Sequence, residues 1–160
     1  MAVYIHSTAS NKFSKNQILL VKPFVIIFLL LFSFSWIAVA QTEKIDSLRK
    51  VLLTAKDTTR INCLNALSKE YVDVNSDTAL LFADAALSEA KVILFTHGMA
   101  DAFLNKGKIE WNKSNLSGAH NYFINAIDLY KKTNDIDLLG SAYENLAQIV
   151  STIGNYSLSI

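Results

Sequence analysis

Residues 100–133, ADAFLNKGKIEWNKSNLSGAHNYFINAIDLYKKT, decide the fold of this chain. Apolar and small side chains recur there at intervals of three and four residues, which is the period of an amphipathic helix. A polar break near the middle divides the stretch into two helices. The small residues Gly107, Ala119 and Ala126 allow those helices to approach closely, and Phe123 fills the space beside them. The stretch therefore predicts a tightly packed helical hairpin.

The same pattern recurs at an offset of forty residues. The matched pairs are Ala79 with Ala119, Phe82 with Tyr122, Ala86 with Ala126, Ala102 with Ala142, Phe103 with Tyr143, Asn105 with Asn145, Gly107 with Ala147, and Ile109 with Ile149. Self-similarity at a fixed period is the signature of a repeat architecture. We therefore expect hairpins at 61–95, 100–133 and 140–160, the last one incomplete, with Ala147 in the packing role of Gly107.

Helical periodicity extends over the rest of the chain beyond residue 40. The segments expected to be helical are 43–55, 59–73, 77–94, 98–113, 117–132 and 136–152, with another helix starting at Asn155. Polar residues Asp57, Thr58 and Thr59 stand where an N-cap is needed before the second helix. The first segment, within residues 41–57, forms a leading helix ahead of the repeats at 58–160.

These residues resemble the tetratricopeptide repeat (TPR) family, whose repeat of about 34 residues combines small and aromatic positions in two helices. The matching residues are Phe103, Gly107, Leu116, Ala119, Phe123 and Ala126, followed in the next repeat by Tyr143, Leu146, Ala147 and Gly154-Asn155-Tyr156. The chain departs from the pattern at Lys106, Glu110 and Ser159. The resemblance implies an all-α, right-handed solenoid of about two and a half repeats.

Residues 1–40 have a different composition from the remainder. They carry three lysines, no acidic residue, and the apolar run FVIIFLLLFSFSWIAVA at 24–40. Ala38 and Ala40 before Gln41 suit signal peptidase, so a cleaved secretory signal peptide is predicted. A retained transmembrane anchor is the alternative, although such a helix spans only about 25 Å of a core of about 30 Å. Both alternatives place the remainder across a bacterial inner membrane.

Charge and reactive side chains exclude several classes of function. The chain has 15 basic and 14 acidic residues, without the excess of positive charge that nucleic-acid binding requires. Its one cysteine, Cys63, is expected to be a small buried residue. His97 and His120 have no partner at metal-binding spacing, and no phosphate-binding glycine loop is present. We therefore expect no catalytic, cofactor or metal site.

In TPR proteins the first helices of the hairpins line a concave groove, and the resemblance carries that role to particular residues here. The groove residues expected are Asn65, Lys69, Leu104, Lys108, Trp111, Asn112, Glu144 and Gln148, together with Asn62, Val72, Asp73, Asp101, Ser141, Ser151 and Thr152. Trp111 either anchors a ligand or packs against the neighbouring repeat. Some TPR proteins clamp a peptide carboxylate, but the third repeat here offers no basic residue for that clamp.

The resemblance also suggests a biological setting. A signal-led chain with degenerate forty-residue repeats is similar to the exported sensor regions of bacterial membrane signalling proteins, in which a kinase or DNA-binding domain follows. The last hairpin stops at Ile160, so we expect a piece of a longer protein, attached to the inner membrane through its leader or a downstream segment. The partner is expected to be a protein or peptide. A free-standing periplasmic scaffold and the accessory region of an enzyme are alternatives.

Overall fold

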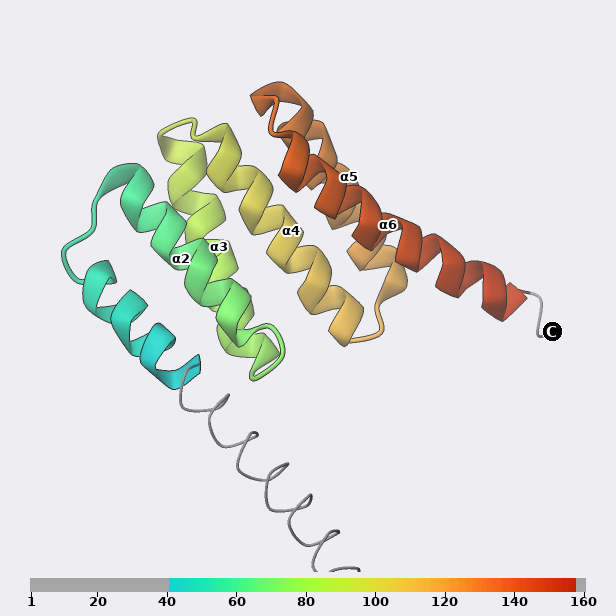
Figure 1. Cartoon of the computed structure of the whole chain (residues 1–160), viewed down its shortest axis with the longest axis horizontal. Helices are drawn as coiled ribbons and strands as arrows, with labels where there is room; N and C mark the ends of the chain where they lie inside the picture. Colours follow the sequence, from blue (N-terminus) through green and yellow to red (C-terminus); the bar gives the residue numbers. More distant parts are fainter. Residues whose placement is uncertain (1–40, 158–160) are drawn as a thin grey trace, which may run out of the picture. The chain divides into compact units, whose positions relative to one another are not determined.

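The computed structural model describes residues 41–157, and their side chains as far as Gly154. Residues from Lys44 onwards belong to one compact unit, which forms most of the described part of the chain. The proposed leader, with Ala38 and Ala40, lies outside the described residues, and Gln41 is the first of them. Within the described part of the chain every regular element is an α-helix (Figure 1), which confirms the all-α expectation.

The helices follow one another with short connections. A leading helix covers residues 41–52, followed by α2 (Asp57–Tyr71), α3 (Ser76–Val92), α4 (Thr96–Asn112), α5 (Leu116–Thr133) and α6 (Ile136–Ser157). Each of the labelled helices packs against the next one along the chain, and α2 also contacts α4. In Figure 1, α2, α4 and α6 lie in front of α3 and α5, so alternate helices share one side.

The connections between the helices are closed by side chains and by left-handed residues. Asn75, Asn115 and Asp135 each accept a hydrogen bond from the backbone N–H three residues later, at 2.9, 3.1 and 3.1 Å. These caps satisfy N–H groups that lack partners at a helix start. The predicted cap at the start of α2 is wrong, because Lys56 occupies the N-cap position without a side-chain bond and Asp57 already belongs to the helix.

Helices α3 and α4 end with the same backbone geometry. Leu94 after α3 and Ser114 after α4 have φ values of 56° and 61°, in the left-handed region. At the end of α3 the N–H of Phe95 then donates to the carbonyl of Ala90 at 2.8 Å. This six-to-one bond, repeated at 2.9 Å after α4, is the Schellman closure that glycine usually makes. Since neither residue is glycine, this form of the turn was not evident in the sequence.

Close packing between the two helices of a hairpin depends on the small residues. Gly107 of α4 is buried, and a Cβ at this position would overlap the ring of Phe123 in α5. Ala119 and Ala126, on the same face of α5, are fully buried. In the preceding hairpin, the buried Ser68 donates its hydroxyl to the carbonyl of Ala79 at 2.9 Å. The sequence therefore placed these residues at helix contacts correctly.

Helix α6 departs from two expectations. Ala147 is exposed and does not pack as Gly107 does, because no described helix follows α6 to cover that side. The new helix expected at Asn155 is also wrong, since α6 continues unbroken to Ser157. Gly154 has no heavy atom from another element within 4 Å of its Cβ position, so no close packing requires a glycine there. The face of α6 that packs against α5 meets the expectation, because Ala142 and Ile149 are fully buried there.

The leading helix is attached to α2 by polar and apolar contacts. Cys63 donates its thiol to the carbonyl of Leu48 at 3.0 Å, and Arg49 donates to the hydroxyl of Tyr71 at 2.7 Å. Burial raises the pKa of the Cys63 thiol, against the opposing charge of Arg60. This helix therefore covers the open side of α2, and Cys63 is a buried thiol held in its protonated form.

Candidate functional site

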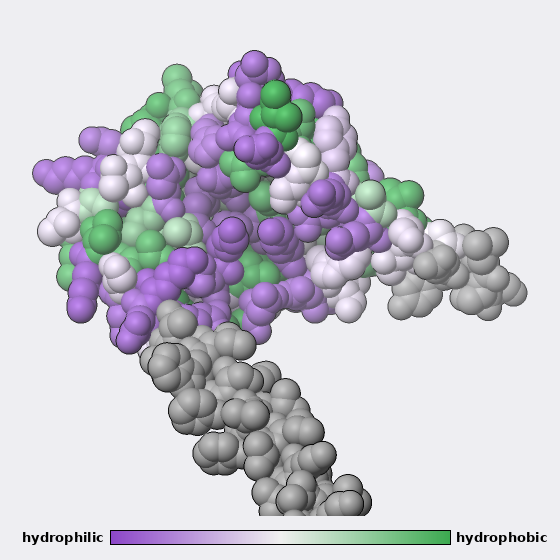
Figure 2. Space-filling view, in the orientation of Figure 1, coloured by the Kyte–Doolittle hydropathy of each residue, from purple (hydrophilic) through white to green (hydrophobic). Residues whose placement is uncertain are grey.

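The face shared by α2, α4 and α6 contains two adjoining cavities. Their volumes are about 240 and 270 Å³, and both are lined by Lys69 and Lys108, so they form one groove. The other lining residues are Asn62, Asn65, Ala66, Asp101, Leu104, Asn105, Leu138 and Ser141 on one side of the lysines, and Val72, Asp73, Trp111, Asn112, Asn145 and Gln148 on the other. Figure 2 shows hydrophilic side chains over the middle of this face.

Most of the residues named from the sequence line this groove. Glu144 is an exception, being exposed and absent from the lining. Its neighbour Asn145 lines the groove instead, because residues 141, 145 and 148 share one face of α6. Ser151 is exposed outside the groove, and Thr152 lines a further cavity of about 310 Å³ beside Trp111.

The two lysines at the centre of the groove have no counter-ion. Neither the ammonium of Lys69 nor that of Lys108 forms an ion pair or hydrogen bond within the described residues. Burial, together with the charge of Lys69, lowers the pKa of Lys108, although Asp73 acts in the opposite direction. Two like charges in a partly desolvated groove are unfavourable unless an anion joins them. The groove therefore holds two ammonium groups without a direct ion pair, and the carboxylates of Asp73 and Asp101 lie farther out in the same lining.

Three asparagines join the helices beneath the groove. Asn105 of α4 donates its amide to the carbonyl of Asn65 at 2.9 Å, and Asn112 donates to the carbonyl of Val72 at 3.2 Å. Asn65 in turn donates to the carbonyl of Gly98 at 2.9 Å. For Asn65 and Asn105, which are buried, these bonds explain why polar residues occupy such positions. They tie α2 to α4 along the floor of the groove.

One acceptor in this network remains open. Asn65 is only 4% exposed, yet its Oδ1 has no hydrogen-bond partner within the described residues. A buried acceptor without a donor costs about 1–3 kcal/mol. Because Asn65 lines the groove, a ligand N–H or O–H is one group able to satisfy it.

Trp111 packs against its neighbours, as one of the two alternatives drawn from the sequence expects, and its role as a ligand anchor stays a prediction. Its ring packs against the core cluster that contains Phe123 and Tyr130. The same side chain is half-buried and lines the groove and the adjoining cavity. Trp111 is therefore a fixed, partly exposed aromatic surface, which is the kind of residue that anchors binding partners.

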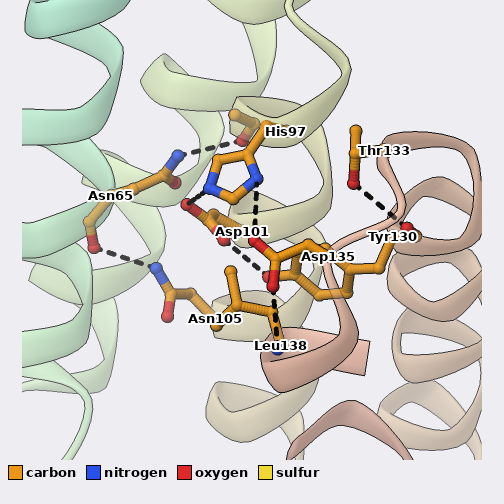
Figure 3. Close-up of polar contacts among 9 residues, drawn as sticks. Asn65, His97, Asp101, Asn105, Tyr130, Thr133, Asp135 and Leu138 are labelled. Carbon is orange, nitrogen blue, oxygen red and sulfur yellow. Dashed lines mark hydrogen bonds and ion pairs between the residues drawn. The ribbon is translucent and has the colours of Figure 1, made fainter. Parts of the chain in front are cut away.

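A second polar cluster lies at the end of the groove where α6 begins (Figure 3). The hydroxyl of Tyr130 donates to Asp101 Oδ1 at 2.5 Å. His97 lies between two carboxylates, with Nε2 at 3.5 Å from Asp101 Oδ2 and Nδ1 at 3.7 Å from Asp135 Oδ2. Because Asp135 also caps α6, this cluster connects the first turns of α4 and α6.

Burial controls the titration of this cluster. Desolvation raises the pKa of Asp101, and Asp135 adds to the increase, while the Tyr130 bond and the charges of His97 and Lys69 oppose it. Desolvation and the negative charge of Asp101 raise the pKa of Tyr130 well above its usual range. The phenol is therefore a stable donor, and the pair is structural in character.

Sequence reasoning placed His97 in a turn and missed its partners. His97 is in the first turn of α4, and its contact with Asp135 joins residues 38 positions apart, as Tyr130 and Asp101 are 29 apart. The i, i+4 spacing of His97 and Asp101 was the only local signal.

Lys106, which stands where the TPR pattern has leucine, forms an ion pair with Asp84 at 2.6 Å. This departure from the pattern therefore supplies a polar contact between α3 and α4.

The described side chains form no group of three that could hold a metal ion. No helix among residues 41–157 is long and apolar enough to cross a membrane. Compared with protein-family models, curated proteins and solved structures, the chain matches none. The groove geometry is therefore the basis for a functional proposal.

Proposed function

We propose that this chain is an exported, TPR-like interaction module that binds a peptide segment of a partner protein in the groove of α2, α4 and α6. In this proposal the hairpins form a right-handed solenoid, and the first helix of each hairpin supplies the binding face. The observation that carries it is the continuity of that groove. Three helices that alternate along the chain contribute to one lining around Lys69 and Lys108.

The residues that line the groove are better suited to binding a peptide than to catalysing a reaction. It combines asparagine and glutamine amides, which pair with peptide N–H and C=O groups, with the half-buried Trp111 as an apolar anchor. The floor is fixed by the bonds from Asn105 and Asn112, so little order has to be gained when a ligand binds. A preformed groove of this kind favours recognition.

Site-specific photo-crosslinking in the source cells tests the binding face. A benzoylphenylalanine at Gln148, which is exposed in the groove, is expected to give one discrete adduct. The matched control is Leu81 on α3, which is 72% exposed outside the groove lining. Trp111→Ala should remove the Gln148 adduct. The same adduct from Leu81, or none from Gln148, contradicts the proposal.

Export and signalling are the parts of the proposal that come from the sequence. N-terminal sequencing of the protein from cell-envelope fractions should yield a chain beginning at Gln41 if the leader is cleaved. A retained leader gives the anchored form instead. The sensory role predicts that the reading frame continues beyond Ile160 through further repeats and a membrane helix. A stop codon there favours the free-standing scaffold.

A further inference from the structure

We propose that the centre of the groove is a carboxylate site, which receives one acidic side chain from within a peptide segment. This inference rests on the proposed peptide-binding function and names the chemistry that the peptide must carry. Lys69 from α2 and Lys108 from α4 hold the carboxylate between them. Asn65 Oδ1 accepts a hydrogen bond from the adjoining part of the same peptide.

The first observation is that two ammonium groups without an ion pair line the same part of the groove. Lys69 and Lys108 line both cavities, and neither has an ion pair within residues 41–157. Lys106, Lys113 and Lys44 are instead paired with carboxylates at 2.6, 3.3 and 2.6 Å. The other described lysines that lack an ion pair, which are Lys50, Lys56, Lys91 and Lys132, lie outside the groove lining. Lys108 is half-buried and close enough to Lys69 for their charges to repel. An anion between them removes that repulsion.

The second observation is the open acceptor of Asn65. It is independent of the lysines, because the Asn65 side chain is buried and its amide nitrogen is already bonded to Gly98. A carboxylate cannot satisfy Oδ1, since both groups are acceptors. The ligand must therefore bring a donor as well as an anion. A peptide provides both, through its side chain and its backbone N–H.

The charges at the two ends of the groove limit the ligand further. Asp101 lines one side of the lysine pair and Asp73 lines the other. A second acidic group on either side of the bound carboxylate meets one of these aspartates, whereas an uncharged or basic neighbour does not. Phosphate, with nearly two charges, is disfavoured for the same reason. The expected segment therefore has a single acidic residue with neutral or basic neighbours.

The groove extends past the lysines in both directions, which favours an internal residue over a chain end. One cavity continues to Leu138 and Ser141, and the other continues to Trp111 and Gln148. A peptide that ended at the lysines would leave one of these cavities empty. An internal glutamate or aspartate allows the peptide to occupy both.

Fluorescence titration of the full chain tests this site. The chain has two tryptophans, so the variant Trp36→Phe leaves Trp111 as the only indole reporter, and it lies in the groove. Three heptapeptides serve as probes: acetyl-KAAEAAK-amide, its glutamine counterpart acetyl-KAAQAAK-amide, and acetyl-KAAQAAK with a free terminal carboxylate. We expect the glutamate peptide to bind at least about tenfold more tightly than the glutamine amide, a difference of about 1.4 kcal/mol.

Charge variants identify the residues responsible. The double variant Lys69→Gln/Lys108→Gln should abolish the preference for glutamate over glutamine. The matched control Lys132→Gln removes an exposed lysine outside the groove lining and should retain it. Added salt should weaken the preference. A preference that survives the double variant overturns the proposal.

The remaining outcomes separate this inference from the proposed function. Equal binding of the glutamate and glutamine amides overturns the carboxylate site and leaves peptide binding in the groove intact. Binding of the free-acid peptide as tight as that of the glutamate amide overturns the assignment to an internal residue. No change in Trp111 emission with any peptide up to millimolar concentration overturns both proposals.

Discussion

Helices α4 and α6 carry the same sequence pattern forty residues apart, but within the described residues only α4 is covered on both sides. The positions that face the preceding hairpin behave alike, since Ile109 and Ile149 are both fully buried. The positions that face the following helix differ. Gly107 is buried under Phe123, whereas the matched Ala147 is exposed. A repeat pattern thus gives each helix two packing faces, and the burial of each face depends on its neighbour.

The substitutions with the largest expected effect compare the faces of α4 and α6 that pack against the preceding hairpin. Ile109→Ala and Ile149→Ala should each lower the free energy of unfolding by about 2–5 kcal/mol, because each opens a cavity among fully buried side chains. Urea unfolding of the full chain, followed by circular dichroism, measures both. A near-neutral Ile149→Ala would show that α6 is not firmly docked on α5.

The aromatic positions on the outward faces should separate α4 from α6. Phe103 packs against two core clusters and stacks on Tyr122 at a centroid distance of 6.2 Å. Its replacement by alanine should cost about 2–4 kcal/mol. The matched Tyr143 is 45% exposed, and Tyr143→Ala should cost less than about 1 kcal/mol. Comparable losses for the two variants would mean that another surface covers Tyr143.

Glycine-to-alanine substitutions in α4 and α6 sharpen the comparison, because they should change the stability of the protein in opposite directions. Gly107→Ala should destabilise the chain by about 1–3 kcal/mol, since the new Cβ overlaps the Phe123 ring. Gly140 of α6 has no atoms near its Cβ position, so Gly140→Ala should stabilise the helix by up to about 1 kcal/mol. Thermal unfolding distinguishes these outcomes. Stabilisation by Gly107→Ala would contradict close packing of α4 on α5.

A further effect, similar in size to that of Gly107→Ala, concerns the polar cluster between the two helices. Asp101→Ala leaves the Tyr130 hydroxyl without its acceptor and should cost about 1–3 kcal/mol, whereas Asp101→Asn keeps an acceptor and should cost less.

The pH dependence of the same pair has a definite sign. The pKa of Asp101 is raised by burial, so the folded state binds its proton more tightly than the unfolded state. The wild type should therefore lose stability relative to Asp101→Asn as pH rises from the ordinary aspartate pKa to the raised one, and the difference should stay constant above it. Urea unfolding at several pH values measures this difference. A difference independent of pH would contradict the shift.

The sequence was sufficient for the helices and for much of the groove. Spacings of three, four and seven residues indicate which side chains share a helix face, and Lys69, Lys108 and Trp111 line the groove as that spacing predicts. The prediction that Glu144 lines the groove is wrong, because adjacent residues of a helix are rotated by about 100° about its axis and Glu144 therefore points away from the face that Asn145 shares. The pairing of His97 with Asp135 and of Tyr130 with Asp101 could not be read locally, since both depend on how separate helices dock.

By itself, the sequence determined that residues beyond position 40 form helices, and that small residues mark the contacts between them, because both properties arise from local periodicity and side-chain volume. Tertiary structure decided the rest. It buried Gly107 and exposed Ala147, and among the described residues it left Lys69 and Lys108 without a direct ion pair and the Oδ1 of Asn65 without a hydrogen-bond donor. Burial and charge pairing belong to atoms brought together from distant positions, so no single segment of the chain specifies them.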